Sequence, residues 1–258
     1  MATARPERSS LSLTWVGHAT VLLEMDGARF LTDPLLRSRV AHLRRVRPLE
    51  TSVPARLDAV LVSHAHYDHL DVPSLRRLDP SIPVVAPPGA GSVLRRAGCE
   101  RVVAAEVGKQ LVFGGVAVRP TPAAHPGGGG LRRSEAVGFV VDGSASVYFA
   151  GDTDLFDGMA DLGPVDLALL PVWGWGPSLG RGHLDPRRAA AAVSLLHARV
   201  AVPIHWGTYY PLHQRRGAFL TEPPLEFRRL VAETARETRV EVLGLGETLE
   251  LSTVGAVS

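Results

Sequence analysis

Four side chains that can bind metal ions fall within six positions, at the end of an apolar run. Residues 60–70 read VLVSHAHYDHL, so His64, His66, Asp68 and His69 directly follow a predicted buried strand. Because residues two apart at a strand end point to the same side, His64 and His66 can share one cation. The turn that follows can direct Asp68 and His69 to a second cation. The spacing therefore predicts two adjacent metal sites.

Three more candidate ligands follow predicted strands elsewhere in the chain. They are His125 in TPAAHPGG, Asp152 in VYFAGDTD and His205 in VAVPIHWGTYY. Strand ends are where α/β folds place functional groups. A single strand-end histidine or aspartate is a weak signal, since most are structural. Their joint occurrence with the first cluster indicates one shared site.

The elements that must position these residues are short Val- and Leu-rich runs, which predict strands, and segments with helix start signals. The clearest helix start is Asp185 followed by Pro186, an N-cap with proline at the first helical position. We expect mixed sheets with helices packed outside, an α/β (α+β) fold. Strands are predicted at 11–16, 21–25, 28–31, 59–62, 84–86, 116–119, 137–141, 147–150, 167–172, 200–204 and 240–243, and helices at 71–78, 91–97, 185–197 and 224–235.

The motifs WVGHATVLLEMDGARFLTDP, VSHAHYDHLD, FAGDTD and IHWGT, with His125, together resemble the metallo-β-lactamase-fold hydrolase superfamily. The resemblance implies a four-layer αββα sandwich of two mixed sheets flanked by helices, with residues 1–258 forming one domain. GHATVLL, LTDP and GHLDPRRAA further resemble the branch that contains the N-acyl-phosphatidylethanolamine-hydrolysing phospholipase D enzymes and the ascorbate-6-phosphate lactonases.

The resemblance also implies a ligand set and a cofactor of two divalent metal ions. Zinc is the expected metal because imidazole and carboxylate ligands suit it, although Mn²⁺ or Fe²⁺ accept the same donors. His64, His66 and His125 would bind one ion; Asp68, His69 and His205 would bind the other; Asp152 would bridge both.

Further roles follow from the same resemblance and from the chemistry of metal sites. Asp68 could also orient the attacking hydroxide or accept its proton, and His183, just before the predicted helix, is implied to contact substrate. Asp33 is the candidate acceptor for the free N–H of a metal-bound imidazole. For His18, a functional and a structural role stay open. The neighbouring aromatic residues could form either pocket wall or core: Trp173, Trp175, Trp206, Tyr209 and Tyr210.

Composition narrows the class of protein. The chain has 258 residues, a formal charge of +2 and 28 basic residues, of which only Lys109 is a lysine; this balance does not indicate a nucleic-acid partner. Cys99 is the single cysteine, so no internal disulfide is expected and a reducing cytoplasm fits best. No apolar run approaches the ~20 residues of a membrane helix. Residues 35–56 hold six arginines, which form either a solvated basic loop or a rim that attracts an anionic substrate.

The sequence thus predicts a metal-dependent hydrolase that uses hydroxide activated by a dinuclear centre to cleave an ester, lactone or phosphodiester bond in a small molecule. Two alternatives stay open: an N-acyl-phosphatidylethanolamine phospholipase D-like phosphodiesterase, and a non-catalytic metal-binding protein of the same fold. Against the first, Pro126 and four glycines follow His125, where the phospholipases tend to carry tryptophan and a nearby arginine. The oligomeric state is left open.

Overall fold

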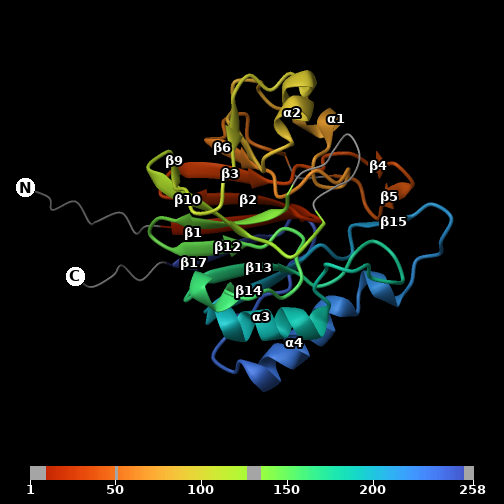
Figure 1. The fold of residues 1–258 in the computed structure, drawn as a ribbon. Coiled ribbons are helices and arrows are strands. Elements are labelled where there is room, and N and C mark those ends of the chain that lie inside the picture. Colours follow the sequence, from red (N-terminus) through yellow and green to blue (C-terminus); the bar gives the residue numbers. More distant parts are fainter. Residues whose placement is uncertain (1–9, 50–51, 127–134, 253–258) are drawn as a thin grey trace, which may run out of the picture.

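The computed structural model describes residues 10–49, 52–126 and 135–252. Two seven-stranded sheets lie face to face, with α1 and α2 on one outer side and α3 and α4 on the other (Figure 1). Both sheets contain parallel and antiparallel pairs, so the predicted αββα sandwich of mixed sheets is confirmed. The assignment of residues 1–258 to one domain stays a prediction.

The first sheet has the strand order β17-β1-β2-β3-β6-β7-β8. Its first four strands are antiparallel and its last four, from β3 onward, are parallel. The bounds are β17 Thr248–Ser252, β1 Ser10–Gly17, β2 Thr20–Met25, β3 Ala28–Thr32, β6 Ala59–Leu61, β7 Val84–Ala86 and β8 Val102–Ala104.

The second sheet has the order β16-β14-β13-β12-β11-β10-β9 and mirrors this division, with parallel pairs up to β12 and antiparallel pairs beyond it. The bounds are β16 Arg239–Val240, β14 Val200–Ile204, β13 Leu167–Pro171, β12 Ser146–Phe149, β11 Val137–Asp142, β10 Val116–Pro122 and β9 Leu111–Phe113.

Alternation along the strands divides the buried side chains into three apolar layers. Leu13, Phe30, Phe139 and Phe149 lie in the central layer, between the two sheets. One outer layer joins the first sheet to α1 (Val72–Leu75) and α2 (Gly91–Ala97), and the other joins the second sheet to α3 (Pro186–Leu196) and α4 (Pro223–Thr234). Short 3₁₀ turns lie at Met159–Leu162 and Ala218–Leu220. Burial on both faces explains why the parallel strands are continuous apolar runs.

The start of α3 follows the predicted signal. The Asp185 side chain accepts a hydrogen bond from Arg188 N at 2.8 Å, and Pro186 occupies the first helical position. This cap fixes where the preceding loop, with His183, joins the helix. Among the described residues, no helix is long and apolar enough to cross a membrane.

The arginine-rich residues 35–56 differ from the solvated loop that was one of the two expectations. They contain β4 (Arg39–Val40) and β5 (Leu43–Arg45), which form a small third sheet with β15 (Tyr209–Pro211). Leu35, Val40 and Leu43 are buried against Tyr209. The loop interpretation is wrong for these strands, because their apolar side chains pack on a residue far along the chain.

Candidate metal centre

Both large sheets deliver side chains to one edge of the sandwich. His64, His66, Asp68 and His69 follow β6 of the first sheet, whereas the other predicted ligands follow strands of the second: His125 after β10, Asp152 after β12 and His205 after β14. His18, Asp33 and His205 have φ values of 56°, 32° and 64°, in the left-handed region that non-glycine residues rarely adopt. Such strained backbone is concentrated at functional sites.

The first group of nitrogen atoms belongs to His64, His66 and His125. His64 Nε2 lies 2.9 Å from His66 Nδ1, and His125 Nε2 lies 3.1 Å from the same atom. The three ligand atoms lie within 4.8 Å of one another, close enough to bind one ion. The sequence predicted this set.

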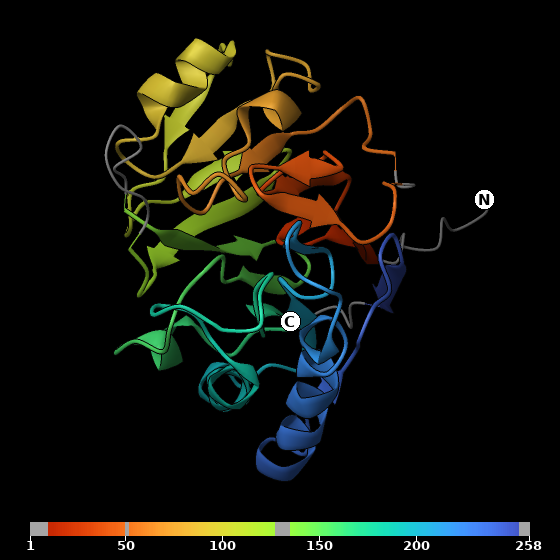
Figure 2. The ribbon, with the colours of Figure 1, turned by 90° about the vertical axis from the view of Figure 1, so that its right-hand side faces the viewer.

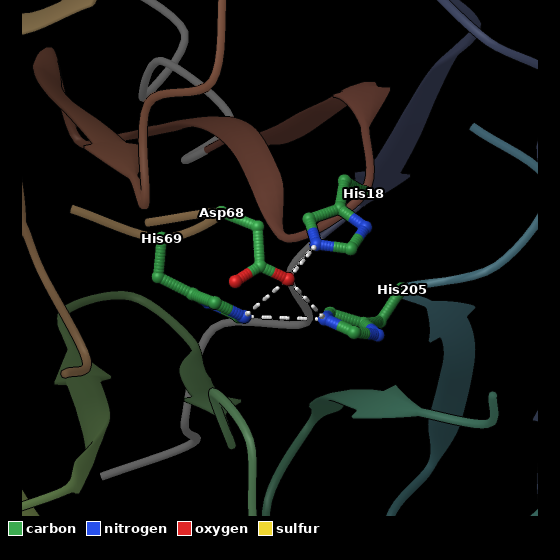
Figure 3. Close-up of side chains that lie close together, drawn as sticks. All are labelled: His18, Asp68, His69 and His205. Atoms are coloured by element: carbon green, nitrogen blue, oxygen red, sulfur yellow. Dashed lines mark hydrogen bonds and ion pairs between the residues drawn. The ribbon is translucent and has the colours of Figure 1, made fainter. Parts of the chain in front are cut away.

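The second group contains Asp68, His69 and His205, as predicted, and also His18 (Figure 3). His69 Nε2 lies 3.1 Å from His205 Nε2. Asp68 Oδ2 lies 3.8 Å from His69 Nε2, 4.0 Å from His205 Nε2 and 3.1 Å from His18 Nε2. The role of His18 was open from the sequence, because only the fold brings it to Asp68.

The carboxylate of Asp152 lies between the two groups. Its Oδ2 is 3.1 Å from His69 Nε2 and 3.9 Å from His64 Nε2, and its Oδ1 is 3.2 Å from His205 Nε2. Oδ1 is buried and has no hydrogen-bond partner with acceptable geometry among the described residues. A buried carboxylate oxygen without a donor is costly unless a cation faces it.

Contacts behind the rings determine which nitrogen carries the proton. His69 Nδ1 donates to Asp33 Oδ2, His125 Nδ1 to Gly182 O and His205 Nδ1 to Trp173 O, each at 2.7 Å. The Oγ of Ser63 donates to Asp33 Oδ2 at 2.6 Å, so it accepts from the Nδ1 of its neighbour His64 at 3.0 Å.

With those protons in place, His64, His69, His125 and His205 would each present an Nε2 lone pair to the cluster whenever the ring is neutral. Lone pairs that face one another at about 3 Å, as in His69 and His205, repel unless a proton or a cation lies between them. Imidazole nitrogens and carboxylates are the donors that Zn²⁺ and similar divalent ions prefer. The residues present therefore fit a metal centre.

Charge supports the same conclusion. Burial lowers the pKa of His64 and His66, and lowers that of His205 to about 3, so these imidazoles are neutral and able to bind a metal ion. For Asp68 and Asp152, burial acts to raise the pKa, but nearby histidines lower it below the usual range. Burial alone would lower the pKa of His69. The carboxylates of Asp152, Asp68 and Asp33 outweigh burial and raise this pKa well above its usual value. The two carboxylates are therefore ionised and favour a proton on His69, and a bound cation could take the place of that proton.

His183 lies beside the predicted ligands. Its Nε2 is 3.4 Å from Asp152 Oδ2, and its ring centroid is 4.7 Å from that of His125. Burial opposes protonation, but the hydrogen bond to Asp152 raises the pKa of His183 overall. Of the two predicted catalytic residues, Asp68 is thus one of the predicted ligands, and His183 adjoins them.

Two of the aromatic neighbours take the packing role, and a pocket-wall role for the others stays a prediction. Trp206 stacks on Trp15 at 5.0 Å, and Tyr209 is buried, so both are packing residues. Trp175 instead contacts His42 edge to face at 5.0 Å, outside the main core.

Comparisons with known proteins agree with this geometry. The β-lactamase superfamily domain matches residues 28–206. A UPF0173 metal-dependent hydrolase of Methanopyrus kandleri is 32% identical over 253 residues, covering 93% of this chain and 100% of the relative. N-acyl-phosphatidylethanolamine-hydrolyzing phospholipase D 1 of Caenorhabditis elegans is 31% identical over 276 residues, covering 95% and 77%.

An uncharacterized protein of Mycobacterium tuberculosis is 34% identical over 226 residues, covering 80% of this chain. The chain matches only 61% of the length of that relative. Among solved structures, Igni18, a metallo hydrolase from Ignicoccus hospitalis, superimposes with a TM-score of 0.74 at 24% identity, covering 94% of this chain and 99% of the other.

The matched domain spans more than half of the chain, and the M. kandleri relative matches over its whole length. The chain therefore belongs to the β-lactamase superfamily, and it has the metallo-β-lactamase fold.

Proposed function

We propose that the protein is a dinuclear metal-dependent hydrolase that cleaves an ester, lactone or phosphodiester bond in a small, anionic substrate. One observation carries the proposal: two groups of ligand atoms, His64/His66/His125 and Asp68/His69/His205, converge on either side of the Asp152 carboxylate. Each group would bind one ion, and Asp152 would bridge them.

When bound, two such ions lower the pKa of water and polarise the oxygen of the scissile bond. The chain's own residues supply the remaining steps. Asp68 Oδ2, held by His18 Nε2 at 3.1 Å, can accept a proton from the attacking water or orient it. His183 carries a raised pKa and directs Nε2 toward the cluster, so it can donate a hydrogen bond or a proton to a substrate oxygen.

The first experiment is elemental analysis of protein purified without chelators, followed by rate measurements on chromogenic lactone, carboxyl ester and phosphodiester substrates. We expect close to two metal ions per chain and one class of substrate hydrolysed. His66→Ala and Asp152→Ala should lose both metal and activity. His183→Ala should keep its metal but lose about 10²- to 10⁴-fold in kcat/KM.

His197→Ala is the matched control, because His197 caps the end of α3 outside the cluster. Unchanged metal content in both the His66 and the Asp152 variant would refute the ligand assignment. Loss of metal in the His183 variant would make His183 a ligand. No metal and no activity after addition of Zn²⁺ or Mn²⁺ would favour the non-catalytic interpretation.

The similarity to the C. elegans phospholipase, over 95% of this chain, favours a second candidate function. In that case the phosphodiester would belong to N-acyl-phosphatidylethanolamine. Adding this lipid in vesicles to the substrate panel separates the two candidates, because hydrolysis of the lipid alone would select the phospholipase activity.

Zinc as the metal, a cytoplasmic location and the absence of a nucleic-acid partner stay predictions from the sequence. The imidazole-rich donor set supports zinc, and the elemental analysis would identify the metal.

A further inference from the structure

A cavity of about 550 Å³ opens beside the small third sheet. β4 and β5, in orange, and β15, in blue, lie together at one edge of the sandwich (Figures 1 and 2). The lining of the cavity is dominated by one residue type and, among the described residues, includes no acidic side chain. Its arginines are Arg39, Arg44, Arg45, Arg47 and Arg216.

None of these five arginines forms an ion pair with a carboxylate of the described residues. By contrast Arg37, on the same segment, donates to both oxygens of Asp71, at 2.9 and 2.6 Å. Arg216 donates to Val46 O at 2.9 Å, a neutral partner. Four of them, Arg39, Arg44, Arg47 and Arg216, are exposed, and like charges around one cavity repel one another unless a counter-charge enters.

Arg45 differs from the other four, because its side chain is buried on the face of β5 opposite to Arg44. Only 5% of Arg45 is exposed, and its Nε has no hydrogen-bond partner among the described residues. Its other nitrogens donate to neutral groups, Val16 O at 2.5 Å and the Tyr209 hydroxyl at 3.3 Å. A guanidinium stays charged at all ordinary pH values, so a buried one without a carboxylate is costly.

Two chains of side-chain contacts lead from the third sheet, which borders the cavity, to the candidate metal centre. The ring of Tyr209, which binds Arg45, contacts the ring of His18 edge to face at 5.7 Å, and His18 binds Asp68. In addition, His42, in the turn between β4 and β5, lies 6.3 Å from Tyr67, which stands between two predicted metal-site residues.

We propose that this arginine-lined cavity binds a phosphate group, and that it anchors the substrate beside the metal centre. One guanidinium can satisfy a single carboxylate by bidentate binding, so four exposed guanidinium groups favour an anion of higher charge with more acceptor oxygens. The anchoring role rests on the proposed function, whereas phosphate binding by the cavity can be tested without any turnover.

The test uses the metal-loaded protein and calorimetric titration with glycerol 3-phosphate. The variant R44Q/R47Q removes two exposed cavity arginines and leaves buried Arg45 in place. R228Q/R236Q is the matched control, because it removes the same charge from exposed positions in and just after α4. We expect R44Q/R47Q to bind glycerol 3-phosphate at least tenfold more weakly than the wild type, and R228Q/R236Q to bind it with the wild-type affinity. Added salt should weaken binding to the wild type and to the control.

Equal affinity in wild type and R44Q/R47Q would overturn the proposal, because the phosphate would then bind elsewhere, such as at the metal centre. Equal weakening in R228Q/R236Q would overturn it as well, since only net charge would matter. Calorimetry tests phosphate binding, and the substrate panel tests the proposed hydrolase function. A negative result in one measurement therefore does not decide the other.

A second arm identifies the source of the phosphate group. Vesicles of phosphatidylcholine with phosphatidic acid carry the same phosphomonoester on a lipid. If these vesicles capture the wild type and not R44Q/R47Q, while glycerol 3-phosphate does not bind, the phosphate comes from a lipid headgroup. If neither probe binds in a manner that depends on the cavity arginines, the proposal is wrong.

Discussion

Asp33 shows how much a single carboxylate behind the cluster determines. Its Oδ2 accepts from His69 Nδ1 at 2.7 Å and its Oδ1 accepts from Ser63 N at 2.7 Å, so it orients the ring and keeps Nε2 free for a metal. We expect Asp33→Asn to weaken metal binding about 10- to 100-fold.

Competition with a chromogenic chelator measures the affinity. Asp58→Asn is the control, because Asp58 accepts from Arg29 N at an exposed position. Wild-type affinity in the Asp33 variant would contradict this role.

His205 gives the metal-free protein a dependence on pH. Burial lowers its pKa from 6.5 to about 3, so below pH 6.5 the unfolded chain binds a proton that the folded chain does not. Stability should therefore rise with pH between about 3 and 6.5, by up to about 1.4 kcal/mol per pH unit for this one proton.

We expect His205→Asn to reduce that slope in chelator-treated protein, as measured by denaturant unfolding between pH 4 and pH 6. The same replacement at His197, outside the cluster, provides the comparison. If the two variants have equal slopes, His205 is not a source of the acid sensitivity.

At the scale of elements, the loop between β13 and α3 positions His125. Gly182 in this loop accepts from His125 Nδ1 through its carbonyl, and its φ of +77° is unfavourable for other residues. A Cβ there would lie 3.0 Å from Pro126 Cδ and 3.2 Å from His125 Nδ1. We expect Gly182→Ala to displace His125 and to reduce bound metal from about two ions per chain to about one.

Gly180→Ala is the matched control in the same loop, because a Cβ there would make only ordinary contacts, at 3.6 Å from His183. Elemental analysis of both variants decides the point. Two ions retained in the Gly182 variant would show that the loop does not hold His125 in place.

Elements whose residues are buried on both faces were predictable from the sequence. The apolar runs of β6, β13 and β14 are continuous, and each ends at a residue of the site or close to one. β17 (Thr248–Ser252) was missed because it is a half-exposed edge strand whose burial alternates. β5 was missed because arginines interrupt its apolar pattern and its partner, β15, lies far along the chain.

The site divides in the same way. The predicted ligands follow strands, so the sequence pattern finds them. The contact of His18 with Asp68 was not predictable, because it joins residues 50 positions apart and requires a left-handed backbone at His18. The arginine cavity likewise depends on the third sheet rather than on any local pattern.

At the scale of the whole molecule, the candidate metal centre draws its residues from both sheets. The first sheet supplies the residues after β6, and the second supplies His125, Asp152 and His205. Without metal, imidazoles from opposite sheets face each other, as His69 and His205 do at 3.1 Å. An ion bound only by the folded arrangement stabilises it by mass action.

Removal of metal should therefore destabilise the sandwich as a unit. With free metal at about a thousand times its Kd, the expected loss is about 4 kcal/mol, which corresponds to a fall of roughly 10 °C in Tm for a chain of this size. Calorimetry before and after chelation, with Zn²⁺ or Mn²⁺ added back, measures the change.

Asp152→Asn should show a smaller fall in Tm on chelation, because the carboxylate that joins the groups is lost. Asp142→Asn is the control and should match the wild type, because Asp142 forms a partly exposed ion pair with Arg119. An unchanged Tm after chelation of protein shown to contain metal would mean that the sheets hold together without the centre.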